Sequence, residues 1–312
     1  MNLTDLARNF SNAEDARKHL EAVRWPDGTI CPHCGSLGES YRLEAKPESK
    51  TPVRPGVWKC KGCRKQFTVT VGTIFADSHI PLHKWLMAIH LLCASKKGMS
   101  SHQLHRMLGV TYRSAWFMTH RIRFAMSPNG TEKKLTGTVE VDETYVGGKR
   151  KGIGRRGRPS IDSHKSPVVS LVQRNGNVRS FHVPTVSAKN LKEVMGANIQ
   201  PGAEIMTDDF SAYDWVKTRF PNHDVIKHSA GSYSRREGTK NVNTNTVEGF
   251  FSLLKRGIHG TFHHVSKQHL HRYLDEFDFR YNARHIEDGA RTNMAIRGVA
   301  GKQLTYREAK QK

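Results

Sequence analysis

The chain has 312 residues, of which 50 are Lys or Arg and 28 are Asp or Glu, and its formal net charge is +22. This length exceeds the size at which single hydrophobic cores stop growing, so we expect more than one domain. The hydrophobic share of 37% is large enough for a packed core and excludes a disordered basic tail. The charge indicates a polyanionic partner, because Lys and Arg neutralise phosphates and release their counterions.

An anionic membrane is the competing partner. It would require basic residues on an amphipathic helix or beside a lipid anchor, and we find neither pattern. The longest apolar stretch, Leu86–Ala94, is interrupted by His90 and is far shorter than the ~20 residues that span a bilayer. The first ten residues lack the apolar centre of a signal peptide. We therefore expect a soluble cytoplasmic protein with no membrane partner.

Two CxxC pairs form the strongest local signal, Cys31 with Cys34 and Cys60 with Cys63. Two such turns supply the four thiolates of a tetrahedral Zn²⁺ site. The distance between the pairs is longer than the ~15–20 residues of common zinc patterns. The Pro- and Lys-rich loop between them accounts for this, since extra loop length adds little closure entropy. The fifth cysteine, Cys93, lies on an apolar helical face and is expected in the core, and an odd count argues against a disulfide scaffold.

Residues 98–126 have the pattern of a helix-turn-helix. Ser100 or Ser101 would cap a helix that ends at Gly109, and Thr111 would cap a second helix. A plain three-helix bundle gives the same pattern and remains an alternative. The polar side of the second helix would present side chains that reach DNA bases or phosphates, namely Tyr112, Arg113, His120, Arg121 and Arg123.

From Gly137 the pattern changes to that of a mixed α/β domain. A strand is predicted over 138–145, and Asn175-Gly176 indicates a hairpin between two further strands. A hairpin followed by crossover connections gives a sheet with antiparallel and parallel parts, covered by helices. The basic, glycine-rich loop 149–158 would contact the DNA backbone through Lys149 and Arg150. A solvated hairpin tip is an equally good interpretation of that loop.

Three acidic residues lie within, or at the end of, predicted strands and helices of this domain. Asp142 lies in a strand, Asp208 at the end of another and Glu248 on a helix. Carboxylates that converge in this way can hold two divalent ions, which stabilise the attacking and leaving oxygens of phosphoryl transfer, and Mg²⁺ prefers such oxygen ligands. Strand alternation places Glu140 on the face of Asp142, as a supporting group, and Glu143 on the opposite face. Ordinary salt bridges are the alternative role for these acids.

Lys255 lies seven residues after Glu248, two turns along the same helical face. It is therefore placed to contact a phosphate of a substrate held at the acidic residues. Arg256 adds a second positive charge beside the same helix.

The sequence resembles insertion-sequence transposases of the DDE class that carry an N-terminal zinc ribbon. The resemblance rests on WKCKGCRKQFTVTVGTIF, VEVDETYVGG, TDDFSAY and NTNTVEGFFSLLKRGIHGTFHHVSK, and it extends over about residues 15–298. It implies an α/β fold with a ribonuclease H-like mixed sheet and flanking helices. We expect an N-terminal helix and zinc ribbon over 1–72, a helix-turn-helix segment over 73–130 and the catalytic domain over 131–312.

The resemblance also implies an activity. Asp142, Asp208 and Glu248 would hold catalytic Mg²⁺ or Mn²⁺, and Lys255 would contact DNA. The protein would cleave the terminal inverted repeats of a transposon and transfer the 3′-hydroxyl strand into target DNA. It would act as a homo-oligomer in a synaptic complex, associated with a bacterial nucleoid. Two alternatives remain: a non-catalytic DNA-binding regulator built from the zinc ribbon and helix-turn-helix, and a nuclease of the same fold that joins no strands.

Overall fold

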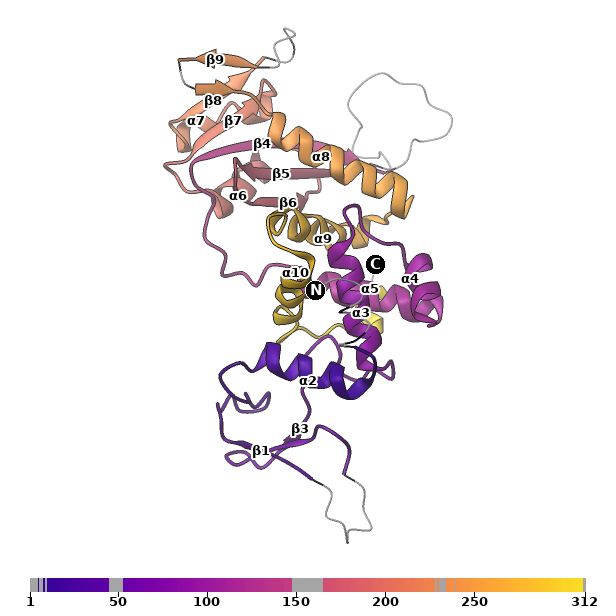
Figure 1. Cartoon of the computed structure of the whole chain (residues 1–312). Coiled ribbons are helices and arrows are strands. Elements are labelled where there is room, and N and C mark those ends of the chain that lie inside the picture. Colours follow the sequence, from indigo (N-terminus) through magenta and orange to yellow (C-terminus); the bar gives the residue numbers. More distant parts are fainter. Residues whose placement is uncertain are drawn as a thin grey trace. The chain divides into compact units, whose positions relative to one another are not determined.

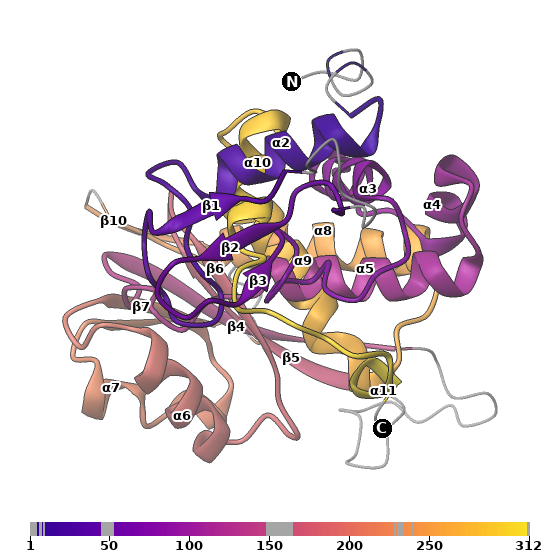
Figure 2. The same ribbon diagram turned by 90° about the horizontal axis from the view of Figure 1, so that it is seen from below.

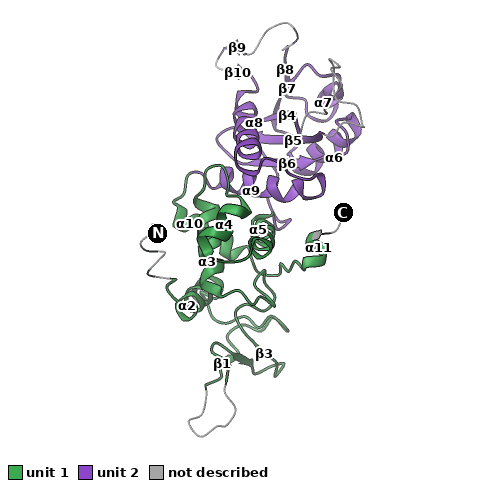
Figure 3. Cartoon of the chain, turned by 90° about the vertical axis from the view of Figure 1, so that its right-hand side faces the viewer, with its two compact units in different colours: residues 1–127, 285–312 green, residues 128–284 purple. Residues whose placement is uncertain are grey.

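A computed structural model describes residues 5, 8, 10–44, 53–147, 165–227, 229, 234–238 and 240–310. The chain forms two compact units (Figure 3). Unit 1 comprises residues 1–127 together with 285–312, and unit 2 comprises residues 128–284. The expected catalytic domain extended to residue 312, whereas the compact unit that contains the main sheet ends at Arg284. Lys149 and Arg150 lie outside the described residues.

Unit 1 contains a small antiparallel sheet and a set of helices. The sheet has the order β1-β2-β3 and carries the second CxxC pair at the end of β2 and in the turn that follows. Its elements are α2 (Ala13–Arg24), β1 (Ser40–Arg42), β2 (Trp58–Cys60), β3 (Gln66–Phe67), α3 (Leu82–Ala94), α4 (Ser101–Leu108), α5 (Tyr112–Met126), α10 (Asp288–Arg297) and α11 (Tyr306–Lys310).

The C-terminal segment completes the core of unit 1. Helix α10 packs against α2 and α3, and its Ala295 and Ile296 are buried. His90 Nδ1 lies 3.0 Å from Thr292 Oγ1 in this interface. Cys93 of α3 is fully buried, which confirms its predicted place in the core. Unit 1 is therefore assembled from both ends of the chain.

Unit 2 is built on a five-stranded mixed sheet with the order β6-β5-β4-β7-β8 (Figure 1). Strands β4, β5 and β6 pair antiparallel, whereas β7 and β8 run parallel to β4. The described elements are β4 (Thr138–Val146), β5 (Ser166–Gln173), β6 (Val178–His182), α6 (Ala188–Asn198), β7 (Glu204–Asp208), a 3-10 turn (Ser211–Tyr213), α7 (Val216–Arg219), β8 (His223–Ile226), β9 (Arg235–Glu237), β10 (Lys240–Val242), α8 (Asn245–Gly257), a π-helical turn (Ile258–Phe262), a 3-10 turn (Lys267–His269) and α9 (Leu270–Asn282).

The predicted hairpin and the mixed α/β layout are both confirmed. Asn175 adopts a left-handed φ of 57° between β5 and β6, a conformation that Asn tolerates well. Helices cover both faces of the sheet: α8 and α9 lie on one side, and α6 and α7 on the other (Figures 2 and 3). In the part of the chain that the structure describes, no helix combines the length and apolar character needed to cross a bilayer.

Side-chain alternation assigns each residue of β4 to one of two cores. Val139 and Val141 pack with Leu171 and with α6 on one face. Val146 packs with Val168 and with α8 and α9 on the other. Asp142 is the register partner of Ser170 and therefore belongs to the α8 and α9 face. Helix α8 is thus held on the face of the sheet that carries Asp142.

A buried carboxylate fastens α9 to the edge strand β6. Asp278 accepts hydrogen bonds from the Ser180 backbone N–H at 2.6 Å and from the Ser180 hydroxyl at 2.7 Å. Burial is the main cause that raises the pKa of Asp278 to about 7; the nearby charge of Asp275 acts in the same direction, and the Ser180 hydrogen bonds act in the opposite direction. Asp278 therefore binds a proton more tightly in the folded protein than in the unfolded chain.

We expect stability to fall as the pH rises from about 4 to about 7, because over this window the folded state binds more protons at Asp278 than the unfolded state does. Asp278→Asn imitates the neutral acid and removes this loss. The unfolding free energies of variant and wild type are measured by urea titration at pH 5 and pH 8. Relative to the wild type, the variant should be more stable at pH 8 than at pH 5. An unchanged difference would show that Asp278 titrates normally.

Candidate functional site

The three acidic residues predicted from the sequence lie on neighbouring elements of unit 2. Asp142 is in β4, Asp208 is the last residue of β7 and Glu248 is in the first turn of α8. Strands β4 and β7 pair in parallel with Glu140 opposite Met206, an offset of 66 residues. Asp142 and Asp208 have the same offset, so the continued register places them at the same level of adjacent strands.

The charges of these residues act on one another. Burial, together with the charges of Glu143, Asp208 and Glu248, raises the pKa of Asp142 to about 8, and burial is the largest of these causes. The Glu143 backbone N–H, which donates to Asp142 Oδ1 at 2.7 Å, opposes this shift. The side chain of Asp142 is therefore poorly solvated and lies within the electrostatic reach of both other acids.

The three carboxylates are not gathered as tightly as the ligands of a single ion. Among the described residues, the only group of three or more His, Cys, Asp and Glu side chains whose ligand atoms all lie within 4.8 Å of one another is formed by cysteines. The structure thus brings the three acids to one region of unit 2 without forming a closed single-ion site.

Local hydrogen bonds orient two of the acids. The Phe210 backbone N–H donates to Asp208 Oδ1 at 3.1 Å. The Thr244 hydroxyl lies 3.4 Å from Glu248 Oε1, and Glu248 itself is exposed. The Asp208 carboxylate therefore folds back over the turn after β7, whereas the Glu248 carboxylate remains open to solvent.

Glu143 lies on the opposite face, as alternation predicted. The Tyr213 hydroxyl donates to Glu143 Oε2 at 2.9 Å, and Tyr213 is buried in the core beneath α6. Burial raises the pKa of Tyr213 well above its ordinary value, and the charge of Glu143 adds to the effect, so the phenol remains protonated as the donor. Glu143 is thereby engaged away from the other three acids.

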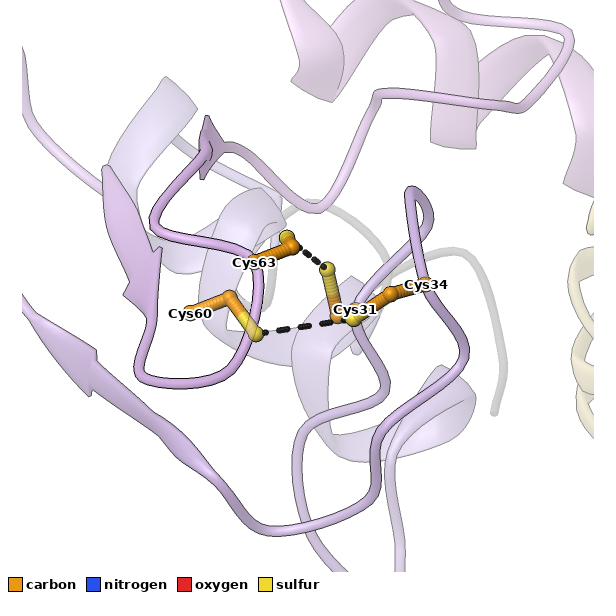
Figure 4. A group of neighbouring side chains, drawn as sticks. All are labelled: Cys31, Cys34, Cys60 and Cys63. Atoms are coloured by element: carbon orange, nitrogen blue, oxygen red, sulfur yellow. Dashed lines mark hydrogen bonds between the residues drawn. The ribbon is translucent and has the colours of Figure 1, made fainter.

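The four cysteines of the two CxxC pairs form a compact cluster in unit 1 (Figure 4). Cys31 Sγ lies 3.7 Å from Cys63 Sγ, and Cys34 Sγ lies 3.6 Å from Cys60 Sγ. A tetrahedral ion with metal–sulfur bonds of about 2.3 Å places its ligand sulfurs about 3.8 Å apart. The spacing and the all-thiol donor set therefore fit Zn²⁺.

Ser36 supports this cluster. Its hydroxyl lies 3.3 Å from Cys34 Sγ and 3.2 Å from Cys60 Sγ. The hydrogen bond from Ser36 is the largest of the effects that lower the pKa of Cys60 to about 6. A thiol with this pKa is largely a thiolate at neutral pH, the form that binds a metal ion.

The local features of the predicted helix-turn-helix are confirmed. Ser100 caps α4 by accepting from the Gln103 backbone N–H, and Thr111 caps α5 by accepting from the Ser114 N–H. Gly109 ends α4 in a left-handed conformation with φ of 59°. The apolar face of α5 is buried at Ala115, Met118, Ile122 and Ala125.

Arg121 is not the DNA-facing residue that the sequence predicted. It is buried, and its guanidinium donates to the backbone carbonyls of Ile74, Ala76 and Leu304 at 2.7 to 2.9 Å. The prediction of a polar side was wrong for His120 and Arg123 as well, because both are buried. Beyond its first turn, α5 is covered by other segments of the chain. The spacing of residues in the sequence gives no information about these segments, so the prediction could not take them into account.

Other predicted DNA contacts are exposed within their own units. Arg113 lies in the first turn of α5 with its guanidinium 4.5 Å from the centre of the Tyr306 ring. Lys255 and Arg256 are exposed in the last turn of α8. These three side chains are therefore sterically available to a polyanion.

Comparison with known proteins assigns both parts of the chain. Residues 134–282 match the ISXO2-like transposase domain, and residues 11–66 match the transposase zinc-ribbon domain. The chain is 27% identical over 291 residues to a protein of the transposable element ISH50 of Halobacterium salinarum, covering 88% of this chain and 92% of the relative. It is also 27% identical over 106 residues to a transposase-like protein of Haemophilus influenzae, covering 34% of this chain and 80% of that protein. The chain thus belongs to the insertion-sequence transposases of the DDE class that carry an N-terminal zinc ribbon.

Proposed function

We propose that this transposase cleaves the ends of its transposon and transfers the freed 3′-hydroxyl strand into target DNA, with Asp142, Asp208 and Glu248 as the ligands of Mg²⁺ or Mn²⁺. One observation carries the proposal: acids from β4, β7 and α8 all raise the pKa of the same partly buried carboxylate. Such mutual repulsion is relieved when a cation is bound. A ribonuclease H-like interpretation of the mixed sheet agrees with this arrangement.

The donor set suits hard divalent ions, because all three side chains offer carboxylate oxygens. When bound, a pair of such ions activates the attacking oxygen and stabilises the leaving oxygen of an in-line phosphoryl transfer. Two ions share several ligands over a wider site than one ion does, so the open arrangement of the three acids is compatible with a pair. The three carboxylates would hold the ions, and no covalent protein–DNA intermediate is required.

Positive side chains would hold the DNA around this site. Lys255 and Arg256 are exposed on the helix that carries Glu248. In unit 1, Arg113 is exposed at the start of α5 and would form a separate contact with DNA. Recognition helices of this type contact DNA with their N-terminal residues. The four clustered cysteines would hold a structural Zn²⁺ that stabilises the ribbon. We further propose that the protein acts as a homo-oligomer on paired transposon ends.

Asp142→Asn and Glu248→Gln are expected to lower Mg²⁺-dependent nicking of a duplex with the element's terminal repeats by at least roughly 100-fold, because each removes a charge that holds the catalytic ions. Nicking is measured on end-labelled DNA, and binding of the same duplex by gel shift should persist. Nicking by both variants at the wild-type rate would refute the acidic site. Specific binding without nicking by the wild type would instead identify a DNA-binding regulator.

Strand joining is measured in the same reaction by following labelled ends into an unlabelled target plasmid. We expect joined products with the wild type and none with either variant. Nicking without joined products would reduce the proposal to a nuclease.

We expect the zinc content of the protein to depend on the four clustered cysteines. Cys60→Ser is expected to lose the single zinc ion per chain and to lower the midpoint of thermal unfolding of unit 1, because metal binding contributes to its folding free energy. Zinc is measured by mass spectrometry of the purified protein. Cys93→Ala is the matched control: it removes a buried thiol outside the cluster and should retain zinc. Full zinc occupancy in Cys60→Ser would contradict the assignment.

Two arginines of α5 should separate DNA affinity from stability. Arg113→Ala is expected to weaken DNA binding and to reduce its logarithmic salt dependence by about 1, with unchanged thermal stability. Arg121→Ala leaves three backbone carbonyls without their donor and should destabilise unit 1 by roughly 3 kcal/mol. Salt titrations of DNA binding and urea unfolding measure the two effects. The reverse outcome would show that Arg121 is the residue that faces DNA.

A further inference from the structure

We propose that buried Glu140 and its partner Arg174 are positioning residues that fix the first turn of α8, and with it Glu248, beside Asp142. This inference rests on the proposed function and extends it to a pair of residues that do not touch the metal ions. Glu140 lies in β4 two positions before Asp142, and Arg174 follows the end of β5.

Glu140 caps the first turn of α8, where the N-cap residue itself provides no side-chain acceptor. The side chain of Thr244, at the N-cap position of α8, makes no capping hydrogen bond. Glu140 Oε2 instead accepts from the backbone N–H groups of Thr246 at 2.7 Å and Val247 at 3.0 Å. These N–H groups have no partner within the helix, and a negative charge at this end is favoured by the helix dipole. Asn243 Oδ1 accepts from the Asn245 N–H at 3.1 Å, and the sheet carboxylate of Glu140 satisfies the next two N–H groups of the helix.

The second carboxylate oxygen of Glu140 also accepts two hydrogen bonds. Oε1 accepts from Arg174 Nε at 2.7 Å and from the Thr246 hydroxyl at 2.8 Å. An ionised carboxylate offers about four acceptor positions, and here two donors occupy each oxygen. Glu140 is fully buried, so no water competes for them. Its oxygens are therefore committed to α8 and Arg174 and do not belong to the metal ligands.

Arg174 holds the segment that leads into α8. Its Nη1 donates to the carbonyl of Asn241 at 2.7 Å and its Nη2 to the carbonyl of Asn243 at 2.9 Å. One guanidinium thus neutralises Glu140 and anchors the chain on both sides of Val242. The approach to the helix and its first turn are fixed by the same pair of side chains.

The consequence for Glu248 follows from its position. It comes directly after Val247, whose N–H is held by Glu140. Glu140 and Asp142 lie on one face of β4 about 7 Å apart, since each residue advances a strand by about 3.4 Å. Strand β4 therefore supplies one proposed acidic ligand, Asp142, and also the residue, Glu140, that fixes the distance between Asp142 and Glu248. Displacement of this turn would displace Glu248 relative to Asp142.

The test is Mn²⁺ binding by the full-length, zinc-loaded protein, followed by the paramagnetic signal of free Mn²⁺. Glu140→Gln places an NH₂ group against N–H donors of α8, so we expect Mn²⁺ to bind about 10- to 100-fold more weakly, as is typical when a group that orients metal ligands is changed. Nicking should then require a correspondingly higher Mg²⁺ concentration. Asp142→Asn defines the binding that does not involve the acidic site.

The matched control is Glu276→Gln. Glu276 is also a buried glutamate paired with an arginine in unit 2, but its partner Arg280 lies on its own helix α9. We expect this variant to lose stability while its Mn²⁺ affinity stays at the wild-type value. An equal loss of affinity in both variants would show a general effect of destabilisation and would overturn the inference.

A milder variant covers the case in which Glu140→Gln does not fold. Thr246→Val removes one hydroxyl donor to Glu140 and keeps the backbone bonds, so a smaller loss of Mn²⁺ affinity, by a few-fold, is expected. Wild-type affinity in both Glu140→Gln and Thr246→Val, or in Thr246→Val where the first is unfolded, would overturn the inference. If the wild type shows no Mn²⁺ binding that depends on Asp142, the proposed function fails first.

Discussion

The charge repulsion that neighbouring acids exert on the poorly solvated carboxylate of Asp142 is the constraint on which the arrangement of unit 2 depends. Asp142 is held at this cost because β4 lies at the centre of the sheet, with apolar packing on both faces. The same strand carries Glu140, whose charge is satisfied by Arg174 and by the N–H groups of α8. Two acids two residues apart thus differ: Glu140 is neutralised within the protein, whereas Asp142 is the acid that we propose to bind a cation.

The net charge of +22 overstates the positive surface that DNA can meet. Arg121, Arg123 and Arg280 are buried. Arg121 supplies hydrogen bonds to three backbone carbonyls, and Arg280 pairs with Glu276. The planar guanidinium serves such tasks because it offers five donors in a fixed geometry. Part of the basic composition therefore stabilises the two units themselves, and the cations left for a nucleic acid are fewer than the sequence count indicates.

Features set by neighbours in sequence could be predicted, and those set by distant segments could not. The caps at Ser100 and Thr111 and the turn at Asn175 depend on a few adjacent residues, and the structure confirms them. The burial of Arg121 depends on carbonyls 45 and 183 residues away.

The acidic site divides in the same way. The elements that carry Asp142, Asp208 and Glu248 followed from sequence patterns, and their role as metal ligands stays a prediction. The support from Arg174 left no sequence signal, because its contacts with Glu140 and with the segment before α8 join residues far apart in the sequence. The discontinuity of unit 1 has a consequence for synthesis: residues 285–312 are made after all of unit 2, so α3 can pack against α10 only once unit 2 has been synthesised. N-terminal domains usually fold first during synthesis, whereas the first helices of this chain cannot complete their native packing before unit 2 has been made.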